Sequence, residues 1–209
     1  MSGFLNYDGP LFRFLDKLAN LFILNVLFIL CSIPVVTIGA SLTALYTITM
    51  KLASGEEGYI FKGYFKAFKD NFKQSTIIWL ILLALGMIFR VDFYVLNSMT
   101  MQPMMVFRVV IFALLVLWFF ETSYVFAVLA KFDNTVKQTM KNALLMSIRH
   151  LPFTAVLFLI SGGAAALAYS FILRALPIVF IIGFSGVAYC QSFIFNNIFA
   201  NYMQKDDNE

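Results

Sequence analysis

The chain has 209 residues, of which 61% are hydrophobic and only 12% are charged. Soluble domains carry about a quarter charged residues, so this chain lacks the polar side chains needed to cover a water-exposed surface. The formal net charge is +4, but the lysines gather in two segments that flank apolar runs. That placement indicates membrane orientation and contact with anionic lipids rather than nucleic-acid binding. The composition therefore predicts a single integral membrane domain over residues 1–209.

The first apolar run, residues 18–52, is too long for one crossing, because it would form a helix of about 52 Å. Pro34 and Gly39 interrupt it. Two interpretations are open: a single kinked span, or a helical hairpin over residues 11–54. We favour the hairpin. Its short second arm is rich in small residues and is expected to pack closely against neighbouring helices and membrane partners.

The segment 55–74 has the periodicity of an amphipathic helix. Its phenylalanines recur at the spacing i, i+4, i+7 and i+11, and its lysines repeat that spacing one residue later, about 100° around the helix. These residues are Phe61, Phe65, Phe68 and Phe72, with Lys62, Lys66, Lys69 and Lys73. Such a helix either anchors in the lipid headgroup region or docks a cytoplasmic or membrane partner through its aromatic face.

Four further apolar runs each match the length of one membrane crossing: residues 75–96, 104–130, 151–173 and 175–198. A helix rises about 1.5 Å per residue, so about 20 apolar residues cross a hydrocarbon core of about 30 Å. Each run therefore predicts one transmembrane helix, and the segment 131–150 predicts a second surface helix. The fold class is all-α: a polytopic transmembrane bundle of five to six segments with amphipathic helices on the cytoplasmic surface.

Basic residues set the predicted orientation. The two basic segments carry Lys51, Lys62, Lys66, Lys69 and Lys73, and then Lys131, Lys137, Lys141 and Arg149. Basic residues are retained on the cytoplasmic side, so both segments and the C-terminus are expected in the cytoplasm of a multi-pass cell-membrane protein. The hairpin interpretation also places Arg13, Lys17 and the N-terminus there. No cleavable signal peptide is predicted, because the first residues lack a basic start before a short apolar core.

Glu121 is the candidate intramembrane polar site. It precedes Lys131 by ten residues, which corresponds to a depth of about 15 Å. A carboxyl group there is costly, so it either ties helices together through Asn25, Gln191 or a hydroxyl, or serves coupling or substrate contact. Other charges fall toward the outer side, and Asp92 is expected to pair with one of two nearby arginines. These outer residues are Arg90, Asp92, Arg108 and Arg174.

No pattern typical of a metal, thiol, hydrolase or ATPase site occurs in the sequence, so no catalytic residue, metal ligand or cofactor is predicted. His150 lies beside Arg149 at the edge of an apolar run and is interpreted as an interfacial residue. Cys31 and Cys190 fall inside apolar runs, where free thiols behave as small hydrophobic side chains.

An ordered string of short motifs covers the first 75 residues or so. It comprises Gly9-Pro10, Asn25, the turn Pro34–Gly39, Ala44–Tyr46, Gly55–Gly58 and Phe68–Gln74. In this string the chain resembles the YesL-like family of small bacterial membrane proteins, a family of unknown function. Members of that family are encoded beside carbohydrate ABC importers and glycan-degrading enzymes of Gram-positive bacteria. The resemblance implies a partner and a pathway, and it carries no catalytic residue over to this chain.

Together these observations support one functional hypothesis: a non-enzymatic accessory membrane protein associated with an oligosaccharide ABC importer. Its expected partners are the lipid bilayer and the permease subunits of the importer, with the aromatic and lysine stripes of residues 55–74 as the docking site. The alternative is an independent small membrane transporter that uses Glu121 and the outer-side arginines.

Overall fold

The structure, a computed structural model, describes residues 10–56, 58–98, 104–170 and 177–206, and every regular element in these ranges is helical. The elements are α1 (Pro10–Ser32), η1 (Val35–Thr37), α2 (Ile38–Ala53), α3 (Ile60–Ser98), α4 (Met104–Lys131), α5 (Val136–Arg149), α6 (Leu151–Ser170), η2 (Val179–Gly183) and α8 (Phe184–Asp206). Six helices of the described part are long and apolar enough to cross a membrane. The predicted fold class, an all-α polytopic membrane bundle, is confirmed.

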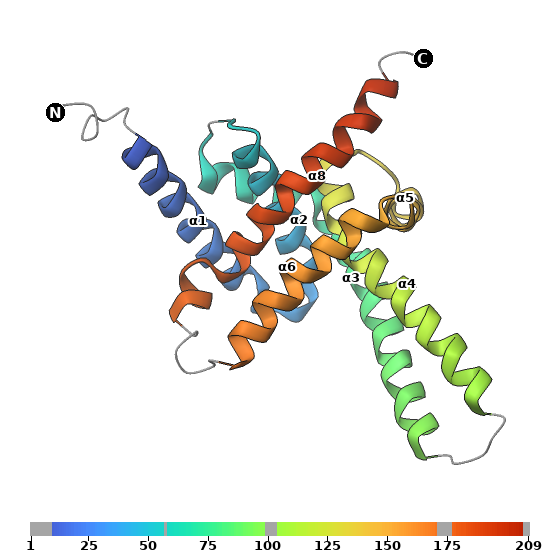
Figure 1. The fold of residues 1–209 in the computed structure, drawn as a ribbon. Helices are drawn as coiled ribbons and strands as arrows, with labels where there is room; N and C mark the ends of the chain where they lie inside the picture. The colour runs from blue at the N-terminus through green and yellow to red at the C-terminus, as the bar shows by residue number, and fades with distance from the viewer. Residues whose placement is uncertain (1–9, 57, 99–103, 171–176, 207–209) are drawn as a thin grey trace.

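Figure 1 shows α2 at the centre of the bundle, with α1, α3 and α8 around it. The start of α1, the α2–α3 connection and the end of α8 lie toward the same end of the molecule. Helices α3 and α4 form a long antiparallel hairpin that extends away from the other helices (Figure 1). The shared core is therefore concentrated around α2, and the far half of the α3–α4 hairpin lies outside it.

The first apolar run forms two helices joined by a short 3-10 turn. α1 ends at Ser32, and α2 begins at Ile38. The Thr37 hydroxyl closes the turn by donating to the carbonyls of Cys31 (2.6 Å) and Pro34 (2.7 Å). From α3, the indole Nε1 of Trp79 donates to the Val35 carbonyl at 2.7 Å. The run thus supplies two of the six candidate spans.

The small-residue face of α2 is buried inside this chain, which corrects the expectation that it packs against membrane partners. Gly39, Ala40, Ser41 and Ala44 are all buried. A Cβ atom on Gly39 would lie 2.5 Å from the Ser75 carbonyl oxygen and 2.7 Å from the Trp79 Cβ. Only glycine permits this approach of the two helices, as expected where helices pack in a membrane without a hydrophobic driving force between them.

Hydroxyl groups join the helices across the core. Thr43 of α2 and Ser75 of α3 share a hydrogen bond of 2.9 Å, and the Ser192 hydroxyl of α8 donates to Thr49 of α2 at 2.8 Å. Such bonds stabilise helix association by about 0.6 kcal/mol each on average, so their contribution comes from their number. They fix the register of α3 and α8 against α2.

The predicted surface helix 55–74 and span 75–96 are one continuous helix, α3, of 39 residues. The separate surface helix was therefore wrong. At 1.5 Å per residue α3 is about 58 Å long, well beyond a hydrocarbon core of about 30 Å. No proline or glycine occurs between Phe72 and Ser75 to end the helix, and the buried Ser75 bonds to Thr43 at the junction.

Substituting Gly39 tests the central packing. We expect Gly39→Ala to destabilise the protein by about 1–3 kcal/mol, because the added methyl group overlaps the α3 backbone. The change is measured as a lower midpoint of thermal denaturation in detergent micelles. Gly162→Ala on α6 is the matched control, since a Cβ there meets no atom within 4 Å. Equal midpoints for the two variants would contradict the α2–α3 contact.

Candidate functional site

The inward face of the first turns of α3 lies one residue before the phenylalanine stripe. Ile60, Tyr64 and Ala67 are buried there, in a core cluster with residues of α1, α2 and α8. Phe65 and Phe68 are half-buried and pack against the same cluster. The helical period was predicted from the sequence, but the phenylalanine face was assigned to lipid or partner contact, and the neighbouring face that is buried in the core was not predicted.

On the side of the same turns that faces away from the core, α3 has an exposed surface of aromatic and basic side chains. Phe61 is 60% exposed and Phe72 is 40% exposed. Their rings continue an aromatic row through the half-buried phenylalanines, with centroids 4.9 Å apart for Phe61–Phe65 and 5.5 Å apart for Phe68–Phe72. All four lysines are exposed. We define the α3 surface stripe as Phe61, Lys62, Lys66, Lys69, Phe72 and Lys73.

A glycine turn fixes the start of α3 against the end of α2. Gly55 has φ +77°, the left-handed conformation that favours glycine. Its amide donates to the Leu52 carbonyl at 3.2 Å, and the Glu56 amide donates to the Lys51 carbonyl at 3.0 Å, which is the Schellman pattern of a helix end. The turn therefore holds the first residues of α3 close to α2.

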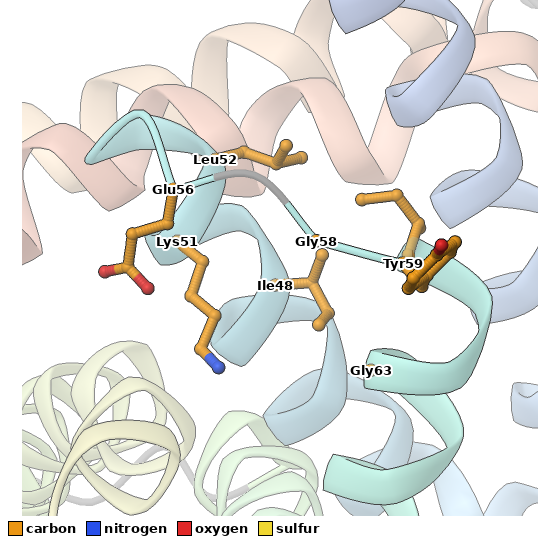
Figure 2. A pocket seen from close by; sticks show the side chains of 8 residues that line it. Ile48, Lys51, Leu52, Glu56, Gly58, Tyr59 and Gly63 are labelled. Atoms are coloured by element: carbon orange, nitrogen blue, oxygen red, sulfur yellow. The ribbon is translucent and has the colours of Figure 1, made fainter.

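A shallow pocket of about 140 Å³ lies at this corner, between Ile48 and Lys51 of α2 and Tyr59 and Gly63 at the start of α3 (Figure 2). The Lys51 and Glu56 side chains extend outward from the corner in Figure 2. Ligand sites usually span about 300–1,000 Å³, so this volume is too small for a sugar or nucleotide.

The structure does not bring the predicted intramembrane charges together. Glu121 is half-buried in α4, and no hydrogen bond or ion pair joins its side chain to another described residue. The Trp118 indole donates to the Leu82 carbonyl of α3 at 3.0 Å, which aligns this level of the hairpin. Arg90 lies about 12 Å beyond Leu82 along α3, on the side away from Glu121. Arg108 lies about 20 Å from Glu121 along α4.

The remaining outer charges do not form a polar path with Glu121. Arg90 and Arg108 are exposed, and Asp92 is half-exposed. Arg174 lies outside the described residues. Asn25 and Gln191 were candidate hydrogen-bond partners of Glu121. Their side chains bond to other residues instead. A helix tie through either of them is therefore not formed.

Asn25 of α1 instead holds an interruption in the last helix, which the sequence did not predict. Residues Val179–Gly183 form a π-helical turn, η2, ahead of α8. The buried Asn25 amide donates to the carbonyls of Val179 (3.0 Å) and Phe180 (2.6 Å). Its oxygen accepts from the backbone amides of Phe184 (2.9 Å) and Ser185 (3.0 Å).

The amide of Asn25 thus inserts into the hydrogen-bond ladder of the last helix and satisfies four of its backbone groups. Irregular backbone at membrane depth is tolerated where such partners are supplied, and π-turns often mark functional sites. Asn25 is the one asparagine in the otherwise apolar stretch 21–33, and this was the sequence signal available for the contact.

A larger cavity, of about 330 Å³, lies beside this interruption, between α2, α6, η2 and α8. Its walls are mainly apolar and include Leu42, Leu45, Ala164, Ala168 and Val187. Among the described lining residues, the polar side chains are those of Tyr46, Ser161 and Gln191. The volume falls at the lower end of the range typical of ligand sites.

The three polar groups of the cavity bond to one another. The Tyr46 hydroxyl donates to the Gln191 side-chain oxygen at 2.6 Å, and the Gln191 amide donates to the Ser161 hydroxyl at 2.7 Å. The Ser161 hydroxyl in turn donates to the Leu157 carbonyl at 3.0 Å. This chain of bonds connects α2, α8 and α6 across one end of the cavity.

His150 connects the α5–α6 corner with α8. Its Nε2 atom lies 3.1 Å from the Tyr202 hydroxyl, and the Arg149 guanidinium lies 5.9 Å from the centroid of the Tyr202 ring. Burial, and to a smaller extent the charge of Arg149, lowers the pKa of the His150 imidazole below its ordinary value. These contacts join the α5–α6 corner to α8. Both cysteines are free, and no cluster of potential metal ligands occurs among the described residues.

Comparison with known proteins places these features in a family context. A sequence profile described as "Protein of unknown function, DUF624" matches residues 21–93, which include Asn25, Gly39 and the α3 surface stripe. The chain is similar to "Uncharacterized protein YteU" of Bacillus subtilis (strain 168), with 25% identity covering 90% of this chain and 85% of that protein. It is also similar to "Uncharacterized protein YesL" of the same organism, with 26% identity covering 81% and 78%. No solved structure matches.

Replacing Asn25 tests the contact with η2. We expect Asn25→Ala to lower the free energy of unfolding by at least about 1–3 kcal/mol, the cost of one buried polar group left without a partner. Hydrogen–deuterium exchange should also become faster in residues 179–185. Asn20→Ala is the control, because Asn20 bonds to the exposed Asp16 on the same helix at 3.1 Å. Unchanged exchange in Asn25→Ala would show that the amide does not hold the interruption.

Proposed function

We propose a function from one premise: the chain belongs to the YesL-like family of proteins of unknown function. We infer that it is a non-enzymatic accessory membrane protein that associates with an oligosaccharide ABC importer through the α3 surface stripe. The importer as partner rests on the family resemblance, and the place of contact rests on the geometry of α3.

The observation that carries the proposal is that the first turns of α3 have one exposed face, the α3 surface stripe, and an opposite face that is packed into the core. Four exposed lysines lie along the first turns of α3, with the exposed Phe61 and Phe72 at either end. The opposite face of the same turns is anchored in the core by Ile60, Tyr64 and Ala67. This aromatic and basic surface suits a partner with acidic side chains opposite the lysines and apolar side chains opposite the two exposed rings, and a surface fixed on the core needs little ordering on binding.

The position of the stripe relative to the membrane also supports this proposal. Residues 60–74 extend α3 by about 22 Å beyond the apolar part that begins at Ser75. Lysines are retained on the cytoplasmic side, so the stripe is proposed to face the cytoplasm. Cytoplasmic extension of a span is suited to contact with the cytoplasmic loops of a permease or with its ATPase subunits.

The buried polar groups of the bundle favour a role in holding the helices together over a role in transport. These groups bond helix to helix, as Thr43 does with Ser75 and Tyr124 does with Thr154. A transporter built on Glu121 and the outer arginines has less support, because Arg90 and Arg108 lie far from Glu121 along the α3–α4 hairpin. We therefore develop only the accessory function.

Charge reversal in the stripe tests this function. We expect the wild-type chain, affinity-purified from its host in mild detergent, to retain subunits of a carbohydrate ABC importer. The double variant Lys66→Glu/Lys69→Glu should lose them, because like charges then face the partner's acidic surface. Uptake of the importer's sugar should fall in parallel.

The matched control is Lys137→Glu/Lys141→Glu on α5, which changes the same charge at two other exposed lysines. It should retain the importer subunits, and all three proteins should remain in the membrane fraction at equal abundance. A wild-type chain that elutes without importer subunits would contradict the partner. A stripe variant that retains them would contradict the docking site.

A further inference from the structure

The cavity between α2, α6, η2 and α8 is separate from the α3 surface stripe. The chemistry of its walls indicates which ligand it can bind. Among the described residues that line it, none is charged. A buried ion without a partner is costly at membrane depth, so this lining rejects ions, sugar phosphates and charged headgroups. The occupant must be uncharged where it contacts the walls.

Hydrogen-bond donors in the cavity are already used. The Tyr46 hydroxyl and the Gln191 amide donate within the polar chain, which ends at Ser161 and the Leu157 carbonyl. A sugar carries many hydroxyl groups, and most would lose their bonds to water without finding partners here. The cavity therefore suits a ligand that needs no hydrogen bonds.

Small side chains on α6 create the space. Ala164, Ala165 and Ala168 face the cavity from α6, and Val187 and Ala188 face it from α8. At about 330 Å³ the space is too small for a helix, which is about 10–12 Å across with its side chains. A second copy or a partner helix does not fit, whereas a single flexible chain does.

The surroundings supply such a chain. α2, α6 and the last helix are all candidate membrane spans, so the solvent around this cavity is the hydrocarbon of the bilayer. An apolar void left empty loses dispersion contacts that an acyl chain restores. We propose that the cavity is a binding site for one hydrocarbon chain of a membrane phospholipid, placed against the interruption that Asn25 holds.

Photolabelling of the full chain tests this site. The protein is reconstituted in nanodiscs of phosphatidylcholine and phosphatidylglycerol that contain a phosphatidylcholine with a diazirine on its acyl chain. It is then transferred to detergent, which dilutes loosely bound lipid, and irradiated. We expect labels on the cavity faces of α6 and α8, and we expect excess unlabelled phosphatidylcholine to reduce them.

Filling the cavity should exclude the chain. Labelling at these faces should fall about tenfold or more in Ala168→Leu, because the added side chain occupies the space of the acyl chain. Ala166→Leu is the matched control on the same helix, exposed and outside the cavity lining, and should label as the wild type does. Ala164→Val provides a second filled variant if Ala168→Leu unfolds.

Three outcomes would overturn the proposal. The first is an absence of labels from the cavity faces of the wild type. The second is labelling that persists in excess unlabelled phosphatidylcholine, which would show non-specific contact. Labelling that is equal in the filled variants and in Ala166→Leu would place the lipid elsewhere on the surface. If both filled variants unfold, the competition with unlabelled lipid still tests the proposal on the wild-type chain.

Discussion

The contact between α2 and α3 is the one on which the rest of the bundle depends. Gly39 leaves no side chain between the helices, so the Ser75 carbonyl and Trp79 approach the α2 backbone directly. The same level carries the Thr43–Ser75 hydrogen bond. Because lipid is as apolar as leucine, helices in a bilayer gain little from apolar burial alone and need this close packing and bonding. α2 is short, yet it is the most buried of the six candidate spans, since half of its apolar stretch is buried inside the protein.

The other helices take their places from α2. α8 bonds to it through Ser192–Thr49 and through Asn196, whose amide donates to the Met50 carbonyl at 2.9 Å. α1 reaches the last helix through Asn25, which compensates the interrupted ladder of η2. The result is a chain whose internal polar groups serve assembly, and whose exposed features are a basic and aromatic stripe at one end of α3 and an uncharged cavity in the membrane layer.

Much of this fold was predictable from sequence, because membrane spans depend on the length of apolar runs. The break at Pro34–Gly39 was also predictable from residues that disfavour a continuous helix. The continuity of α3 was not, since a lysine stripe next to a span is equally compatible with a surface helix and with a projecting span. Its buried face could not be chosen between neighbouring stripes, because Tyr64 and Phe65 are both apolar and only packing distinguishes them.

The candidate site was less predictable than the fold. The π-turn at Val179–Gly183 has no residue signature of its own, and it becomes visible only when Asn25, distant in sequence, lies beside it. The converse holds for Glu121: its place within a long apolar helix was predictable, but its separation from Arg90 and Arg108 depends on the register of the α3–α4 hairpin. The hydrogen bond from Trp118 to the Leu82 carbonyl aligns the two helices, and no sequence pattern predicts this bond.

The continuity of α3, from the stripe into the part that crosses the membrane and packs against α2, is the feature on which this description depends most. It is tested most directly by the distance between spin labels at Lys62 and Ile88, both exposed, in a chain whose native cysteines are replaced. A continuous helix predicts backbone positions about 39 Å apart with a narrow distribution. A surface helix that bends into a separate span near Ser75 would bring them to about 28 Å. The shorter distance would contradict the account.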